Sequence, residues 1–202
     1  MIVDVAQHLH SRFNPKRLQI PPVSLKRFTR VDLIRLFPSF GFKTGAEIGT
    51  GEGKFAELMC RAIPDLKLWC IDPWERYPGN PRAQHTDVQE NSFRQTQERL
   101  APFPNVQILR TYSMDCVNSF SDNSLDFAYI DANHCFDFFM RDLIEWGKKV
   151  RVGGIISGDD YYRFNHAGVV EAVDAYTRAH QIHEWFITRE AHPTFFWVKG
   201  DR

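Results

Sequence analysis

From Thr44 onward, apolar and polar residues follow one another in blocks that predict an alternation of strands and helices. Short, nearly continuous apolar runs predict buried strands at residues 44–49, 66–72, 106–111, 125–131 and 153–160. The segments between them carry apolar residues at helical spacing, which predicts helices at 52–63, 88–100, 136–150 and 167–180, and a short helix after residue 111. Buried strands separated by helices are typical of a parallel sheet that helices cover on both faces.

The last two apolar runs, at 183–188 and 194–200, predict two further strands. Too few residues lie between them for the crossover that joins parallel strands, so we expect an antiparallel hairpin. The pattern therefore predicts the α/β class, with a doubly wound, seven-stranded, mostly parallel sheet. In such sheets the ligand site lies at the carboxyl ends of the strands.

The N-terminal part of the chain follows a different pattern. Prolines at 15, 21 and 22 interrupt residues 1–28, and a helix is predicted after Thr29 as N-cap, ending before Pro38. We expect an N-terminal arm or helical cap over residues 1–40 and a main domain over 41–202. A loop rich in proline and glycine is expected at 74–87.

Composition and charge narrow the classes of function. The 202 residues carry no formal net charge, which argues against nucleic acid or an anionic membrane as partner. The four cysteines have no C-x-x-C spacing, which argues against a zinc knuckle and against a redox dithiol. The chain has neither a signal-like start nor an apolar run near the ~20 residues of a membrane span. We therefore expect a cytoplasmic protein with reduced thiols.

The stretch "AEIGTGEGKF", residues 46–55, joins the first strand to the first helix through Gly49, Gly51 and Gly53. A glycine turn before a helix cradles a ligand closely, but the nicotinamide pattern G-x-G-x-x-G requires glycine where Lys54 stands. An acid two residues before the turn, Glu47, suits a ligand with a cationic amine.

Further acids follow the other predicted strands. Asp72 comes 21 residues after Gly51, the usual distance for a carboxylate that binds a ribose diol. Amine, ribose and no phosphate together suggest S-adenosylmethionine. Asp131, Asp159 and Asp160 end two more strands, where carboxylates would repel one another unless a cation were bound. The alternative is that each acid caps a helix or stabilises a turn.

The turn also resembles a family signature. Glu47 to Gly53 matches the E-x-G-x-G-x-G motif of the class I S-adenosylmethionine-dependent methyltransferases, and the resemblance covers 44–200. It implies a Rossmann-like sheet with strand order 3-2-1-4-5-7-6. The cofactor-binding residues that it implies are Glu47, Gly49, Thr50, Gly51 and Gly53 for the methionine part, Asp72 for the ribose, Trp74, Ser113, Met114 and Asp115 for the adenine, and Asp131 and Ala132 for the sulfonium end. For Trp74, a loop anchor is the open alternative.

The second half resembles a narrower group. "YIDANHCF" followed by "VGGIISGDDY" is similar to metal-dependent O-methyltransferases, including the catechol and macrolide-sugar enzymes. The resemblance implies Mg²⁺ on Asp131, Asp159 and Asp160, where a metal would lower the pKa of a bound hydroxyl. His134 and Asp131 are the candidate catalytic residues, with His134 as general base or as a supporting group. Without a metal, Asp159 or Asp160 would be the base.

These observations predict divalent-metal-assisted O-methylation of a small hydroxylated molecule, a sugar or a phenol, by a protein able to form a homodimer. The alternatives are a metal-independent methyltransferase and a catalytically silent module that binds S-adenosylmethionine. An N-methyltransferase acting on nucleic acid would carry D-P-P-Y or N-P-P-Y where this chain has "DANH". A nicotinamide oxidoreductase conflicts with the glycine spacing.

Overall fold

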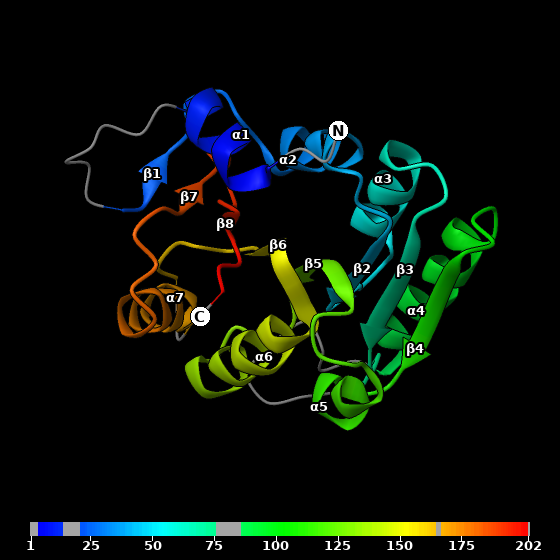
Figure 1. Cartoon of the computed structure of the whole chain (residues 1–202). Coiled ribbons are helices and arrows are strands. Elements are labelled where there is room, and N and C mark those ends of the chain that lie inside the picture. Colours follow the sequence, from blue (N-terminus) through cyan, green and yellow to red (C-terminus); the bar gives the residue numbers. More distant parts are fainter. Residues whose placement is uncertain (1–3, 14–20, 76–85, 165–166, 202) are drawn as a thin grey trace.

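A twisted sheet runs through the protein, and helices cover both of its faces (Figure 1). The structure is a computed structural model that describes residues 4–13, 21–75, 86–164 and 167–201. Within these residues the sheet has eight strands. Their bounds are β1 Val23–Ser24, β2 Thr44–Ile48, β3 Lys67–Asp72, β4 Val106–Arg110, β5 Leu125–Ile130, β6 Val150–Gly158, β7 Phe186–Ile187 and β8 Phe195–Val198.

The strand order is β1-β7-β8-β6-β5-β2-β3-β4. Strand β8 runs antiparallel to both of its neighbours, and all other pairs are parallel. The fold class, the order of the seven expected strands and the C-terminal hairpin are therefore confirmed. The eighth strand, β1, was not expected because the prolines around it obscured a two-residue segment that pairs with β7.

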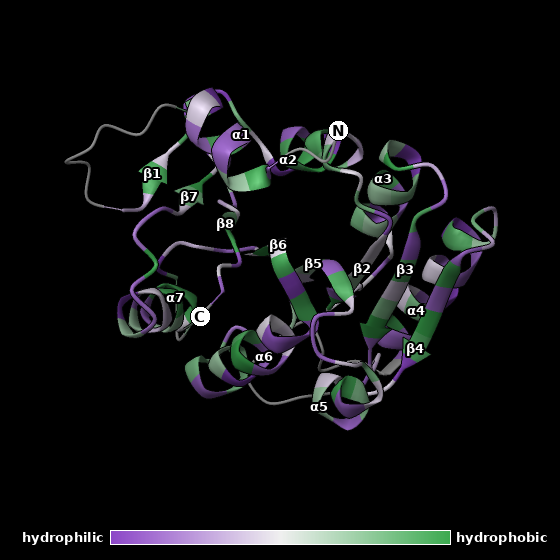
Figure 2. Ribbon diagram, in the orientation of Figure 1, coloured by the Kyte–Doolittle hydropathy of each residue, from purple (hydrophilic) through white to green (hydrophobic). Residues whose placement is uncertain are grey.

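Two layers of helices bury the two faces of the sheet. Neighbouring strand residues point to opposite faces, so Phe127 packs in one core cluster and Ala128 in the other. The first layer contains α1 Val5–Phe13, α2 Arg30–Leu36, the 3-10 helix Phe37–Phe40, α3 Lys54–Ala62 and α4 Thr86–Leu100; the second contains α5 Ser113–Cys116, the 3-10 helix Val117–Ser119, α6 Phe136–Lys149 and α7 Val169–Ala179. In Figure 2 these helices show the mixed apolar and polar stripes of elements that cover a sheet.

The N-terminal arm shares the first core cluster with the rest of the chain, through Val5 and Leu9 of α1. Helix α2 begins as expected at Thr29, whose hydroxyl accepts a hydrogen bond from the Asp32 backbone N–H while the Asp32 carboxylate accepts one from the Thr29 backbone N–H. This capping box fixes the start of α2, where Arg30 lies. Most of the loop expected at 74–87 lies outside the described residues.

No helix among the described residues combines the length and apolar character needed to cross a membrane.

Candidate functional site

A cavity of about 770 Å³ opens along the carboxyl ends of β5, β2, β3 and β4. Its walls also include residues of α2, α3, α4 and α6. The volume lies within the range of small-molecule sites, and the position is the one that the strand order predicts for a ligand.

The glycine turn lines this cavity through Gly49 and Gly51, whereas Gly53, also expected to bind the cofactor, is not among the described residues that line it. Gly49, Gly51 and Gly53 all have positive φ angles, of 92°, 57° and 73°. A Cβ atom on Gly49 would lie 2.0 Å from the carbonyl oxygen of Asp131, so only glycine allows these two strand ends to approach so closely. The Asp72 carboxylate accepts a hydrogen bond from the Gly51 backbone N–H at 2.9 Å, which ties the turn to the end of β3.

Trp74 holds this turn in place through a hydrogen bond and a ring contact. Its indole Nε1 donates to the carbonyl oxygen of Gly51 at 2.7 Å, and its buried ring packs against Phe93 with centroids 4.8 Å apart. Trp74 is not among the described residues that line the cavity. The structure thus favours the loop-anchor interpretation over contact with the adenine. Asp115, which was expected beside the adenine, is exposed on α5 and does not line the cavity either.

Glu47 places a buried carboxylate in the cavity wall. Its residue surface is only 2% exposed, and its Oε2 atom has no hydrogen-bond partner among the described residues. Burial raises the pKa of Glu47 well above the ordinary range, and the charges of Asp131 and Asp72 raise it further, although the nearby Thr50 hydroxyl and the charge of Arg30 oppose the shift. An unpaired buried carboxylate is costly, so this position calls for a ligand that donates hydrogen bonds or carries positive charge.

Asp142, on α6, is a cavity residue that the sequence analysis did not single out. It is 4% exposed, and its Oδ1 accepts a hydrogen bond from the Ser113 hydroxyl at 2.5 Å. Burial raises its pKa to about 6. Its position was a usable signal, because it lies at helical spacing with Phe139, Leu143 and Trp146 on the apolar face of α6. A carboxylate on that face has to be buried.

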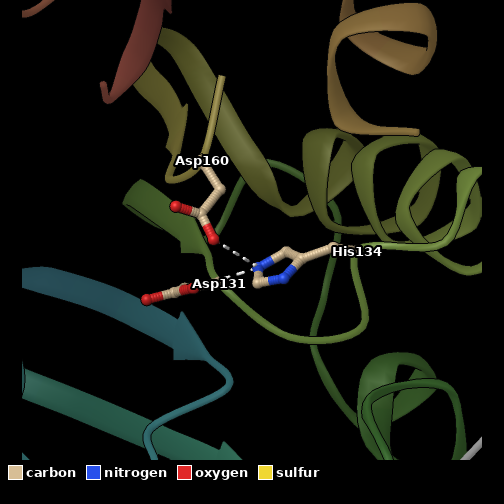
Figure 3. A group of neighbouring side chains, drawn as sticks. All are labelled: Asp131, His134 and Asp160. Carbon is tan, nitrogen blue, oxygen red and sulfur yellow. Dashed lines mark hydrogen bonds and ion pairs between the residues drawn. The ribbon is translucent and has the colours of Figure 1, made fainter. Parts of the chain in front are cut away.

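Asp131, His134 and Asp160 gather at the ends of β5 and β6 (Figure 3). His134 Nε2 lies 3.3 Å from Asp131 Oδ1 and 3.6 Å from Asp160 Oδ2. Although burial acts in the opposite direction, the hydrogen bond and charge of Asp131, with the charge of Asp160, raise the pKa of His134. The other oxygen of Asp160 is held by His192 Nδ1 at 2.6 Å.

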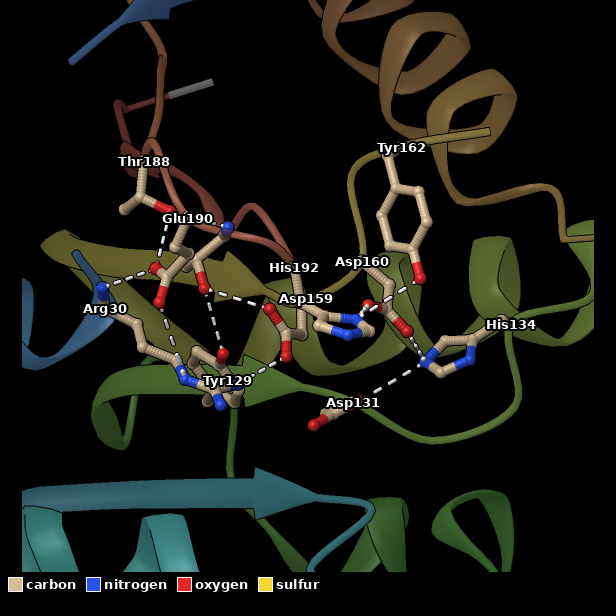
Figure 4. A network of polar contacts seen from close by, with 11 residues as sticks. Arg30, Tyr129, Asp131, His134, Asp159, Asp160, Tyr162, Thr188, Glu190 and His192 are labelled. Atoms are coloured by element: carbon tan, nitrogen blue, oxygen red, sulfur yellow. Dashed lines mark hydrogen bonds and ion pairs between the residues drawn. The ribbon is translucent and has the colours of Figure 1, made fainter. Parts of the chain in front are cut away.

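Asp159 has different partners (Figure 4). Its Oδ2 accepts a hydrogen bond from Arg30 Nη1 at 2.5 Å, and its Oδ1 accepts one from the Thr194 hydroxyl at 3.2 Å. Burial and the charge of Asp131 raise the pKa of Asp159 to about 6, although Arg30 opposes this shift. The structure thus brings His134, rather than Asp159, together with Asp131 and Asp160.

Residues 46–161, more than half of the chain, match the family model of a methyltransferase domain. The chain belongs to this methyltransferase family. The match begins two residues before the end of β2 and ends just beyond Asp160, so it includes the glycine turn and the carboxylates of the cavity. No curated protein matches the sequence significantly.

Solved structures of low identity share the fold of this methyltransferase. An O-methyltransferase from Bacillus cereus, solved with SAH, has a TM-score of 0.62 at 14% identity, covering 96% of this chain and 89% of that one. TomG from Streptomyces achromogenes, an O-methyltransferase of tomaymycin synthesis solved with SAM, has a TM-score of 0.60 at 16% identity, covering 97% and 88%. Spermidine synthase from Thermotoga maritima has a TM-score of 0.55 at 14% identity, covering 87% and 59%. Because the third protein is named for a different reaction, these likenesses carry the fold and not the acceptor.

The residues of the methyltransferase do not fit the expected Mg²⁺ site. Mg²⁺ prefers oxygen ligands in a near-octahedral arrangement. Here a guanidinium and a hydroxyl occupy the two oxygens of Asp159, and the group that converges instead offers two carboxylate oxygens and an imidazole nitrogen, all within 4.8 Å of one another. One of these three donors is a nitrogen atom, and Asp159, the third oxygen ligand expected, is not among them.

Proposed function

We propose that this methyltransferase transfers the methyl group of S-adenosylmethionine to a hydroxyl oxygen of a small molecule, a sugar or a phenol. The observation that carries the proposal is the unpaired Oε2 of Glu47, buried in the cavity wall beside the glycine turn. The amino group of S-adenosylmethionine supplies the positive charge and the N–H donors that this oxygen lacks.

The other lining residues suit the rest of the cofactor. Asp72, at the end of the neighbouring strand β3, offers its carboxylate to the ribose hydroxyls while it holds the turn. Ser113 follows β4 and Asp142 lies on α6, farther along the row of strand ends. The adenine of the cofactor would lie beside them. Asp131 and His134, on the opposite side of β2, are left for the sulfonium end and for the acceptor.

The chain itself then has two chemical tasks. It holds the acceptor oxygen about 3 Å from the methyl carbon, in line with the sulfur, because the sulfonium already activates the methyl group. It also removes the hydroxyl proton. As the oxygen–carbon bond forms and the carbon–sulfur bond breaks, His134 takes that proton, and Asp131 and Asp160 stabilise the imidazolium that results. Mg²⁺ has no part in this proposal, because the residues do not fit it.

Cavity size and charge support a small acceptor. The cavity lies in the small-molecule range, and the chain has no formal net charge to attract nucleic acid. The cytoplasmic location and the homodimer stay predictions.

The test begins with a calorimetric titration of the full chain with S-adenosylhomocysteine, alongside Glu47→Gln and an NAD control. We expect micromolar binding by the wild type, at least tenfold weaker binding by the variant, and none of NAD. Methyl transfer from labelled S-adenosylmethionine to a panel of sugars and phenols then tests the reaction. No binding of S-adenosylhomocysteine would refute the proposal. Tight binding without methylation of any acceptor would favour the silent binding module.

A further inference from the structure

The N-terminal arm places a guanidinium in the wall of the cavity. Arg30 is the first residue of α2, and its backbone N–H donates to Glu190 Oε1 at 2.7 Å. Its Nη1 donates to Asp159 Oδ2 at 2.5 Å (Figure 4). Its guanidinium carbon lies 5.3 Å from the centre of the Phe55 ring. The side chain is one-third exposed and lines the cavity. Arg30 is therefore held by three contacts and still faces the cavity.

Arg30 places its positive charge beside a group of acids at the ends of β5 and β6. Asp131, Asp159 and Asp160 end neighbouring strands β5 and β6, and the side chain of Asp159 is only 6% exposed. Burial, together with Asp159 and Asp131, raises the pKa of the nearby Tyr129 far above the ordinary range, and Arg30 opposes that shift. Carboxylates gathered in this way repel one another, and a cation close by reduces that repulsion.

Other cations of the described cavity do not meet this need. Lys54 pairs with Glu52, and Arg141 lies on α6 next to Asp142. His134 contacts two of the acids but is a cation only when protonated. Arg30 is charged at every physiological pH.

We propose that Arg30 takes the place of a divalent cation at the carboxylate rim, so that a guanidinium from the N-terminal arm, and not a metal ion, carries the positive charge of this active site. The guanidinium and a metal ion would compete for the same oxygen of Asp159. The arm is then a component of the site rather than only a cover for the sheet.

Arg30 has further N–H groups that can donate hydrogen bonds to the substrate that receives the methyl group. A guanidinium carries five N–H groups in a rigid fork; Nη1 donates to Asp159, Nε lies 4.0 Å from Glu190 Oε2, and the remaining N–H groups are not used by these two acids. Because the residue lines the cavity, its free N–H groups are available to an acceptor oxygen on which negative charge develops as the proton leaves. This part of the inference rests on the proposed function, whereas the competition with metal does not.

The experiment measures metal binding, so it needs neither cofactor nor acceptor. Full-length protein is stripped with EDTA, exchanged into metal-free buffer and titrated with Mn²⁺, with free ion followed by electron paramagnetic resonance. The variants are Arg30→Gln, which removes the charge, and Arg35→Gln as matched control on the same helix. Arg35 is 69% exposed and pairs only with Asp32 among the described residues. Circular dichroism and thermal melting verify that each variant is folded.

We expect no saturable Mn²⁺ site tighter than millimolar in the wild type or in Arg35→Gln, and one site at least tenfold tighter in Arg30→Gln. A micromolar Mn²⁺ site in the wild type would overturn the inference, and so would a folded Arg30→Gln protein that gains no site. If Arg30→Gln does not fold, the wild-type titration decides alone, because it either shows such a site or does not. Failure of the proposed function is distinguishable, since it appears as no binding of S-adenosylhomocysteine.

Discussion

Replacing Asp142 by asparagine tests which acid of this methyltransferase recognises the base of the cofactor. The sequence placed Asp115 beside the adenine, whereas the structure places Asp142 in the cavity wall and Asp115 on the surface. Ser113 occupies one oxygen of Asp142, and the other oxygen has no hydrogen bond among the described residues. A carboxylate there favours a base that offers an amino group, as adenine does.

The structure gives the expected magnitude. Asp142 is only 4% exposed, so a hydrogen bond to it is poorly screened, and bonds to charged groups contribute about 1.5–3 kcal/mol. This corresponds to a factor of roughly ten to a hundred in Kd between S-adenosylhomocysteine and S-inosylhomocysteine, whose base carries oxygen in place of the amino group. The asparagine oxygen can still accept from Ser113, which turns the amide N–H groups towards the base. We therefore expect Asp142→Asn to lose this preference or reverse it.

The assay is calorimetric titration of wild type, Asp142→Asn and the control Asp115→Asn with both nucleosides at pH 7.5. The control should bind like the wild type. Because the pKa of Asp142 is about 6, the wild-type preference should shrink at pH 5, where the carboxyl group is protonated. Equal binding of the two nucleosides by the wild type would refute the reasoning, and loss of preference in Asp115→Asn instead would restore the sequence-based assignment.

Three further predictions concern catalysis, pH and the arm. Asp131→Asn should slow methyl transfer by about 10²-fold or more while the Kd of S-adenosylhomocysteine stays within a few-fold. Asp72→Asn should act mainly by weakening the binding of S-adenosylhomocysteine. Equal rates of methyl transfer by Asp131→Asn and wild type would contradict the proposed site. The folded pKa of Asp159, about 6, lies above its ordinary value of 3.8, so the folded protein holds this proton at higher pH and its stability should fall as pH rises from about 4 to 6. The shift in pKa corresponds to roughly 3 kcal/mol of folding free energy at most. In urea unfolding, the free energy of unfolding should depend less on pH in Asp159→Asn than in the wild type. An unchanged pH dependence would count against burial as the cause of the shift. Thr29→Ala removes the capping box of α2 and should lower the free energy of unfolding by about 1 kcal/mol, whereas the exposed Ser39→Ala should change it less; equal losses would show that the cap does not stabilise α2.

Local pattern was enough for most of the architecture. The central strands β2 and β5 read as apolar runs because both faces of the sheet are buried there, whereas β4, at the edge, has no buried residue and a weaker pattern. The hairpin followed from the short connection between β7 and β8. The turn beside the cavity followed from its three glycines, because the positive φ angles there are a local requirement. Strand β1 was missed because two residues are too few to form a pattern.

Side-chain partners were harder to predict, because they depend on elements that are distant in the sequence. Nothing near Asp159 indicates that Arg30, 129 residues earlier, holds its carboxylate. Asp142 and Ser113 likewise meet only because α5 and α6 pack together.

The sequence by itself therefore determined the α/β class, the C-terminal hairpin, the glycine turn and the set of acids at the strand ends, since each depends on local backbone geometry or on burial. The strand order came from the resemblance to a family, because local pattern does not say which strands are neighbours. Only the tertiary structure decided which side chains meet: Trp74 donates to the Gly51 carbonyl, His134 rather than Asp159 lies with Asp131 and Asp160, and Arg30 donates to Asp159, where a metal ion was expected. The physical reason is that a carboxylate takes whichever donor the fold brings within hydrogen-bond distance, and that donor can come from any part of the chain.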